Sequence, residues 1–415
     1  MFCERHFVYR LLFCGVLLAS SVQATPTTPA PTSNDKLRQF MEQVRPQPSA
    51  SQAGGNAVRA AAKVTPEQLQ ERADLLKKGE AALASMQLEP ALMAFERAAN
   101  ILHAADTEIA LVRTYMQYGQ YRRALASGAH TAGAHLDVVG GSALYAWLLH
   151  LGAQTAVAQR LMAETEGRMP GNKALAQVQR QLSSGQPVAT GDMLNPPTRL
   201  APYGFAQSIP AAARVVGSAV LLHSGKQALV PLALLPKAAS KFWLRNGMGQ
   251  LAEGKVGKRL PATGVALVSL GQAMPVPDGY WIADKEPFPG TPGYAVEYVA
   301  MPATANDAAP AWPLLRLGFL GGMVTPTGNE RVLGIDMPAG PRGGPVFDGA
   351  GRLAGMALRG KAGAADQFVP ATQLQKAMGK PLGPGMPAAG IDAKSTADRI
   401  YENSLKISLQ VVAVP

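Results

Sequence analysis

"GPRGGPVFDGAGRLAG", residues 340–355, is the most specific string in the chain. Its glycines predict a backbone that turns tightly and lies close to neighbouring groups. Short apolar runs separated by Gly and Pro surround it and favour an antiparallel β barrel or sandwich. These runs are Val215–Leu222, Ala228–Leu235, Gly264–Leu270, Tyr294–Met301, Leu315–Leu320, Val332–Ile335 and Leu353–Leu358.

The segment Gly340–Pro345 resembles the G-D/N-S-G-G-P nucleophile loop of chymotrypsin-like serine proteases. Two upstream stretches also resemble that family, "VGSAVLLHSGKQALVPLALLPKA" (216–238) and "RLPATGVALVSLGQAMPVP" (259–277). The ending "DQFVPATQLQKAM" (366–378) resembles the strand and short helix that finish bacterial trypsin-like domains. The resemblance covers residues 213–380 and implies two antiparallel barrels with a cleft for an extended peptide.

The same resemblance implies that the catalytic triad is missing. The family's His falls on Leu234, its Asp on Gly264 and its Ser on Arg342. Leu cannot relay a proton, Gly cannot orient an imidazole, and Arg is always charged and is no nucleophile. A serine-type endopeptidase with an unorthodox site stays an alternative. The other candidates in residues 200–380 are His223 and the serines Ser208, Ser218, Ser224, Ser240 and Ser269, none of which lies in the nucleophile loop.

Arg342 has two interpretations. It could recognise a carboxylate, such as a peptide C-terminus, through paired hydrogen bonds. Alternatively, it fills the former site or pairs with a neighbouring acid. Under the first interpretation, the candidate peptide-binding residues are Gly340, Arg342, Gly343 and Gly344.

Residues 64–186 are rich in Ala, Leu, Gln, Glu and Arg and predict helices. Ala91, Ala124 and Ala158 follow one another at spacings of 33 and 34 residues. This region resembles a short tetratricopeptide array, which implies a groove for a peptide or partner helix. Alternatively, the helices only brace the next domain. The residues expected to pack between helices are Gly79, Ala91, Phe95, Ala98, Gly119, Tyr121 and Ala124.

The N-terminus predicts export. Residues 1–24 have the basic start, apolar run and Val22-Gln23-Ala24 ending of a signal peptide, which would remove both Cys3 and Cys14. No later segment is expected to cross a membrane, and the periplasm is the expected compartment, with secretion as the alternative. Residues 25–63 predict a flexible lead that carries a short amphipathic helix at 35–45.

Pro-rich residues 187–212 predict a linker between the helices and the β domain, and residues 381–397 predict a second linker. Residues 398–415 predict a helix followed by a strand over Leu405–Val414. This strand could complete the barrel, as in a circular permutation, or it could be offered to a partner by edge addition.

The charge balance is basic: 39 Lys and Arg against 28 Asp and Glu give a net charge of +11. One basic stretch, residues 237–259, contains Glu253 as its only acidic residue. It predicts a solvated loop face or a docking surface for an acidic protein or an anionic envelope polymer. Its members are Lys237, Lys241, Arg245, Lys255, Lys258 and Arg259.

No metal and no cofactor is expected. Two cysteines exclude a disulfide scaffold and a Cys-ligated metal centre. The histidines His103, His130, His135 and His150 show neither an HExxH pattern nor an acidic partner at ligand spacing. Nucleic acid is not an expected partner because the chain is exported and shows no recognised binding motif.

The sequence therefore predicts a multidomain α plus all-β protein, a helical repeat followed by a two-barrel trypsin-like domain. Its expected function is that of an exported, non-catalytic adaptor that binds a protein or peptide. Besides the endopeptidase, a structural subunit of a cell-envelope assembly stays an alternative.

Overall fold

The structure is a computed structural model. It describes residues 64–184, 200–205, 209–235, 241–298, 308–323, 330–338, 340–360, 363–387 and 394–414. The expected signal peptide, the lead at 25–63 and the helix at 35–45 lie outside these residues. Within the described ranges, no helix is both long enough and apolar enough to span a bilayer.

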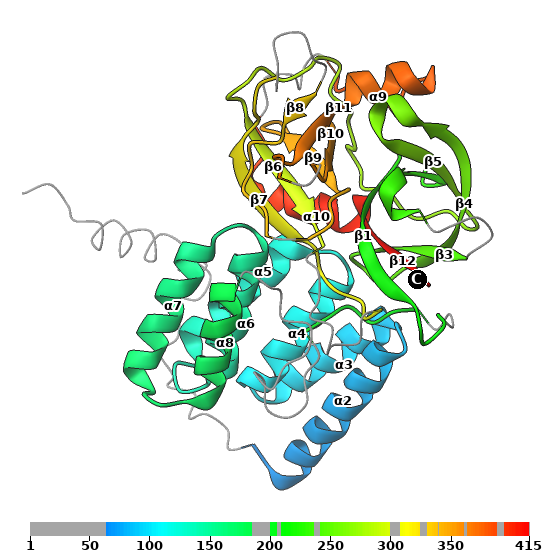
Figure 1. The fold of residues 1–415 in the computed structure, drawn as a ribbon. Coiled ribbons are helices and arrows are strands. Elements are labelled where there is room, and N and C mark those ends of the chain that lie inside the picture. The colour runs from blue at the N-terminus through cyan, green and yellow to red at the C-terminus, as the bar shows by residue number, and fades with distance from the viewer. Residues whose placement is uncertain are drawn as a thin grey trace, which may run out of the picture. The chain divides into compact units, whose positions relative to one another are not determined.

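The first part of the described chain is a run of helices in which consecutive members pack together (Figure 1). Thr65 begins it with a capping box, in which its side chain and that of Gln68 each accept a hydrogen bond from the other's backbone N–H. The helices are α2 (Pro66–Ala84), α3 (Leu88–Ile101), α4 (Ala105–Gln117), α5 (Tyr121–Ala134), α6 (Val139–Leu151), α7 (Thr155–Arg168) and α8 (Lys173–Ser184).

The spaced alanines occupy equivalent places in alternate helices. Ala91, Ala124 and Ala158 are each the fourth residue of their helix, in α3, α5 and α7, and each is 0% exposed. A small side chain at this place allows the neighbouring helix to approach closely. Gly79 shows the same requirement, because a Cβ there would clash with the ring of Phe95.

The second part holds two antiparallel sheets. One is a closed barrel with the strand order β1-β12-β3-β4-β5-β2. Its strands are β1 (Arg214–Leu221), β2 (Gln227–Pro231), β3 (Phe242–Asn246), β4 (Leu251–Leu260), β5 (Val265–Leu270) and β12 (Ser408–Ala413).

The other sheet has six strands in the order β7-β6-β9-β10-β11-β8, and the helix α9 (Ala371–Met378) follows β11 directly. Helices plus two barrel-like sheets are the architecture that the sequence predicts. The strands are β6 (Pro292–Glu297), β7 (Leu314–Phe319), β8 (Arg331–Val332), β9 (Pro345–Asp348), β10 (Leu353–Leu358) and β11 (Gln367–Pro370).

The C-terminal strand belongs to the first barrel. β12 pairs with β1 on one side, where Ala219 faces Leu409, and with β3 on the other, where Leu244 faces Val411. The structure agrees with the alternative in which this strand completes the barrel, because β12 lies between β1 and β3.

The helices and the sheets share one hydrophobic core. The rings of Trp147 (α6) and Trp312 meet edge to face at 5.6 Å. Helix α10 (Ala397–Ile407), which precedes β12, lies between the two parts, and its Tyr401 ring meets Tyr121 of α5 at 4.4 Å (Figure 1). Even the linker is partly buried, since Leu200 is 2% exposed.

Candidate functional site

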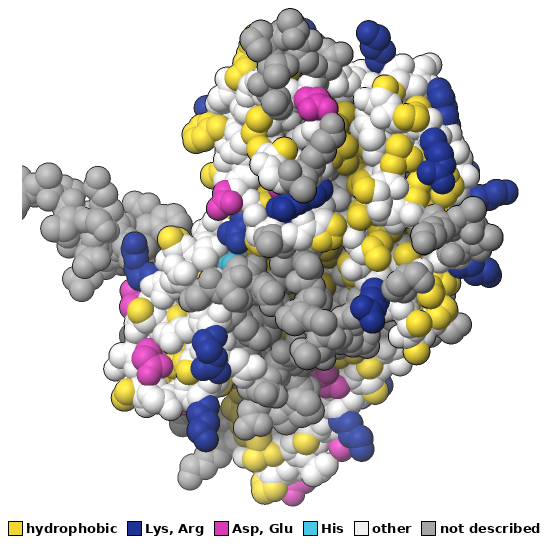
Figure 2. All heavy atoms as spheres, viewed as in Figure 1, with side chains coloured by type: hydrophobic (Ala, Val, Ile, Leu, Met, Phe, Trp, Pro, Cys, Tyr) yellow, Lys and Arg dark blue, Asp and Glu magenta, His cyan; other side chains and the backbone are white. Residues whose placement is uncertain are grey.

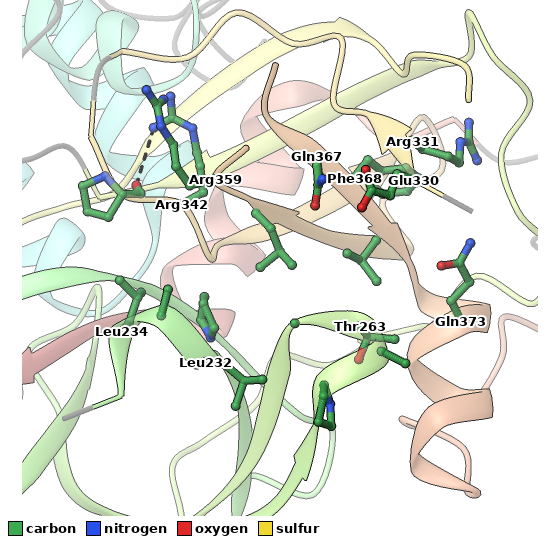
Figure 3. Close-up of a pocket in the computed structure, with 18 residues that line it drawn as sticks. Leu232, Leu234, Thr263, Glu330, Arg331, Arg342, Arg359, Gln367, Phe368 and Gln373 are labelled. Carbon is green, nitrogen blue, oxygen red and sulfur yellow. Dashed lines mark hydrogen bonds between the residues drawn. The ribbon is translucent and has the colours of Figure 1, made fainter. Parts of the chain in front are cut away.

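A cleft of about 620 Å³ lies between the barrel and the six-stranded sheet. Figure 3 shows Leu232, Leu234 and Thr263 on one side of it, opposite Gln367 and Phe368 on the other. The barrel contributes two short 3-10 turns, Leu232–Leu234 after β2 and Pro261–Thr263 before β5. The sheet contributes residues of β8, β10 and β11 and the Pro341–Arg342 segment of the glycine-rich loop.

The structure brings together on this cleft the three residues that the resemblance equates with the triad. Leu234, Gly264 and Arg342 all line it. Gly264 needs to be glycine for its backbone, since it lies in the left-handed region with φ 69° and ends the second 3-10 turn. Three positions that are far apart in the sequence thus border one cavity.

Arg342 does not extend into the cleft as a free cation. Its side chain is 4% exposed, and its Nε lies 2.5 Å from Oδ2 of Asp366. Its Nη2 donates to the carbonyl of Pro338 at 2.7 Å, and its Nη1 donates to the carbonyl of Gly340 at 3.3 Å. The structure therefore agrees with the second interpretation, in which Arg342 pairs with a neighbouring acid. A ligand carboxylate could bind the guanidinium only by displacing these partners, and the carboxylate-recognition hypothesis is corrected accordingly.

The buried side chain of Glu297 accepts hydrogen bonds from the glycine-rich loop, and no sequence pattern predicted it. It is 1% exposed, and its Oε1 accepts hydrogen bonds from the N–H groups of Gly343 at 3.1 Å and Gly344 at 2.8 Å. A Cβ on either glycine would clash, with the carbonyl of Ser218 at Gly343 and with that of Val296 at Gly344. These two glycines thus serve the close packing of the loop and do not line the cleft.

Burial raises the pKa of Glu297 to about 7, although the Ser218 hydroxyl, the two glycine N–H groups and the charge of Arg342 act to lower it. Its second oxygen, Oε2, has no hydrogen-bond partner. A single Glu at the end of β6 carries no motif, so only its position at the end of an apolar strand could have marked it in the sequence.

Among the residues that the structure describes, the lining of the cleft includes no Ser, Cys or His. Its single hydroxyl among the described lining, Thr263 Oγ1, donates to the carbonyl of Leu260 at 3.2 Å, with no base beside it. The lining is mainly apolar, from Leu232, Leu234, Leu358, Phe368 and Val369.

The hydrolase candidates that the structure describes, Ser218, His223, Ser224 and Ser269, are not among the described residues that line the cleft. Ser218 is fully buried in β1, where its Oγ accepts from the N–H of Tyr298 at 3.0 Å. His223 lies in the turn between β1 and β2, with its ring 6.0 Å from that of Tyr280. The Ser218 hydroxyl lies beside the carboxyl of Glu297, but both residues are buried away from the cleft, and His223 makes no hydrogen bond with an acid or a nucleophile among the described residues. Ser208 and Ser240 lie outside the described residues.

The basic stretch is not a loop face. Lys255, Lys258 and Arg259 are exposed along strand β4, and dark blue side chains follow the outer edge of the barrel in Figure 2. Arg245 does not contribute to this face, because it is 3% exposed and its Nε donates to Oε1 of Gln410 at 2.7 Å. Lys237 lies outside the described residues.

Three histidines meet an acidic partner, which the sequence did not predict. Glu108 lies within 3.4 Å of His103, His130 and His135, so the expectation that these histidines have no acidic partner is wrong. The signal was present as Glu108 five residues after His103 and His135 five residues after His130. It was missed because the two pairs come from different helices and only the fold brings them together.

Comparison with known proteins gives likenesses to solved structures only. No protein-family model matches the chain. No curated protein matches it either. The chain is similar to the apo form of the MamO protease domain from Magnetospirillum magneticum, with 18% identity over 41% of this chain and 97% of that one, at a TM-score of 0.29. It is also similar to an inactive form of the Rv3671c protease, with 11% identity over 40% of this chain and 88% of that one, at a TM-score of 0.30. Likenesses at these scores transfer no activity to this chain.

Proposed function

We propose that this chain is an exported, non-catalytic protein that holds an extended peptide segment of a partner in the cleft between its two sheets. In this proposal the β half is a trypsin-like domain whose triad positions are Leu234, Gly264 and Arg342. The observation that carries it is that these three residues border one apolar cleft whose described lining has no Ser, Cys or His.

The dimensions and lining of the cleft suit a peptide. A volume of about 620 Å³ lies within the range of pockets that bind small ligands, ~300–1,000 Å³. Apolar walls bind side chains, while the amides of Gln367 and Gln373 can meet backbone groups of a bound chain. Arg342, tied to Asp366, keeps the loop in place without offering a reacting atom.

The helices are proposed to be tetratricopeptide-like repeats that support a second contact with the partner. The equivalent, fully buried places of Ala91, Ala124 and Ala158 support this assignment. Export is proposed from the pattern of residues 1–24. An acidic protein that uses the exposed lysines of β4 stays one kind of partner consistent with the charge.

The experiment is a selection of peptides from a random display library on the purified chain, with two variants as comparisons. Ala233→Trp places a bulky ring at an exposed position of the cleft lining and should abolish the enrichment. Ala163→Trp makes the same change at an exposed position of α7 and should leave the enrichment intact. Enrichment that survives Ala233→Trp, or no enrichment on the wild type, would contradict a peptide-binding cleft and favour the structural subunit.

A serine-reactive fluorophosphonate probe tests the non-catalytic part of the proposal. The expected result is no labelling of the purified chain, because no described residue of the cleft pairs a nucleophile with a base. Covalent labelling at any residue of the chain would favour the endopeptidase.

A further inference from the structure

A second cluster of polar side chains lies among the helices, in addition to the cleft. His103 follows the end of α3, Glu108 lies in the first turn of α4, and His135 caps the C-terminal end of α5. His130 lies on α5, one and a half turns before His135. The loop after α3 and the C-terminal part of α5 thus direct three imidazoles toward one carboxylate.

The ligand atoms of His103, Glu108 and His135 all lie within 4.8 Å of one another, and His130 lies beside His103 and Glu108. His103 Nε2 lies 2.5 Å from Glu108 Oε1 and 3.2 Å from His130 Nε2. His130 Nε2 lies 3.4 Å from Glu108 Oε1, and His135 Nε2 lies 3.4 Å from Glu108 Oε2. Ligands bound at ~2.0–2.1 Å around a tetrahedral zinc ion stand about 3.3 Å apart.

Two of the converging atoms are buried and have no hydrogen-bond partner. Glu108 is 9% exposed, and neither its Oε2 nor the Nε2 of His135 makes a hydrogen bond, although the two lie 3.4 Å apart. A buried, unpaired carboxylate oxygen carries a substantial free-energy cost unless something satisfies it. A cation bound between these two atoms would satisfy both of them.

We propose that His103, Glu108 and His135 bind a divalent zinc ion, with His130 as the fourth ligand. Neutral imidazole nitrogens and a carboxylate oxygen are zinc ligands, and four of them complete a tetrahedral site. The side chains of His103 and His130 are 59% and 61% exposed, and an open hollow of about 350 Å³ borders Glu108 and His130. The ion therefore has a route from solvent, while Glu108 and His135 provide the buried side of the site.

Bound zinc would join the loop after α3 to the end of α5 and so hold two successive helix pairs together. Its role is structural in this proposal: four protein ligands fill the coordination sphere, which leaves no open position for a reacting water. The site is independent of the peptide-binding cleft, so either proposal can fail alone.

The test uses the full chain, purified without a histidine tag and stripped of metal by a chelator, and titrates it with Zn²⁺ alone in a calorimeter. The expected stoichiometry is one ion per chain, and zinc should raise the melting temperature. The variants His135→Ala and Glu108→Gln should each weaken zinc binding by at least about 100-fold, since each removes one of four ligands. His223→Ala removes a histidine from the turn between β1 and β2, away from the cluster, and should change the affinity by less than about twofold.

Cobalt(II) gives a second readout that does not depend on stability. Co²⁺ in a tetrahedral site has intense visible absorption bands, which should appear with the wild type and be absent with His135→Ala. No zinc binding by the wild type would overturn the proposal and leave the cluster as histidines paired with a carboxylate. Zinc binding that is unaffected by both His135→Ala and Glu108→Gln would also overturn it, because the ion would then sit elsewhere.

Discussion

The guanidinium of Arg342 and the carboxylate of Asp366 form a buried ion pair, with 2.5 Å between Nε and Oδ2 and side-chain exposures of 4% and 14%. The pair ties the glycine-rich loop to the residue that precedes β11. Arg359 and the N–H of Gly360 also donate to Asp366. The pair therefore fixes the glycine-rich loop beside the cleft, which Arg342 lines.

Arg342→Ala is expected to destabilise the fold by about 1–3 kcal/mol, because it leaves the partly buried Asp366 without its main partner. Arg359 keeps one hydrogen bond to Asp366, so the loss should not be larger. Arg259→Ala, at an exposed position of β4, is the matched control and should change stability by less than about 0.5 kcal/mol. Urea unfolding measures both. Equal stability of Arg342→Ala and the wild type would show that the pair does not form.

Glu297 predicts a pH-dependent loss of stability. Its pKa in the folded chain, about 7, lies above the ordinary value of 4.5, so the folded state holds the proton more tightly than the unfolded state. The stability from the neutral carboxyl is complete below pH 4.5 and is lost as the pH rises through about 7. Between pH 5 and pH 8 the loss is roughly 2 kcal/mol.

Glu297→Gln isolates this effect, since the amide oxygen can still accept from Gly343 and Gly344 but the group cannot ionise. The difference in unfolding free energy between variant and wild type should shift in favour of the variant as the pH rises from 5 to 8. A difference that does not change with pH would mean that Glu297 titrates alike in the folded and unfolded chain.

Removal of residues 398–415 is expected to unfold the barrel, because β12 lies between β1 and β3 and no other strand joins them. Near-UV circular dichroism should show the loss of fixed aromatic packing. A chain that keeps the wild-type spectrum after this deletion would contradict the strand order.

Two point variants test the burial of β12 without removing the strand. Val411→Asp buries a charge at a fully buried position of β12 and should destabilise by several kcal/mol. Val157→Asp makes the same change at a 48% exposed position in the first turn of α7 and should cost little, since an acid is favourable near a helix N-terminus. Similar unfolding midpoints for the two variants would argue against a buried β12.

The helices and the sheets are expected to unfold in one cooperative transition, since they share a core around α10. Tyr401 is 0% exposed, meets the Tyr121 ring and donates to the carbonyl of Pro313 at 2.8 Å. Tyr401→Ala should therefore lower stability by about 3–5 kcal/mol, and Tyr401→Phe, which loses only the hydroxyl, by about 1 kcal/mol. Scanning calorimetry checks this, and two separated transitions in the wild type would contradict a shared core.

The sequence predicted best where its pattern was apolar and local. The strand expected over Leu353–Leu358 is β10 with the same bounds. The expected C-terminal helix and strand are α10 and β12, but residues 405–407 of the expected strand belong to α10. Strand β4 was missed, because Glu253, Lys255 and Lys258 give it a polar character that is typical of a loop. A barrel strand with one solvent-exposed face needs few apolar residues, so the hydropathy of its sequence does not identify it as a strand.

The contacts of the glycine-rich loop could not be predicted from the sequence. Glycines at 343 and 344 indicated a tightly packed loop, and both lie where a Cβ would clash. The partners Asp366 and Glu297 come from other strands, and no local spacing connects them to the loop. The contact of Glu108 with the histidines was not predicted for the same reason, since contacts between separate elements depend on the fold and not on a local motif.

The binding of a single peptide to the cleft tests the central claim most directly. A fluorescently labelled peptide from the display selection is titrated with the wild type and with Ala262→Trp, which enlarges an exposed residue of the cleft lining, and the peptide's mass is then measured. We predict saturable binding to the wild type, at least about tenfold weaker binding to Ala262→Trp, and a peptide of unchanged mass. Equal affinity for the two proteins, or a cleaved peptide, would contradict a cleft that binds without catalysis.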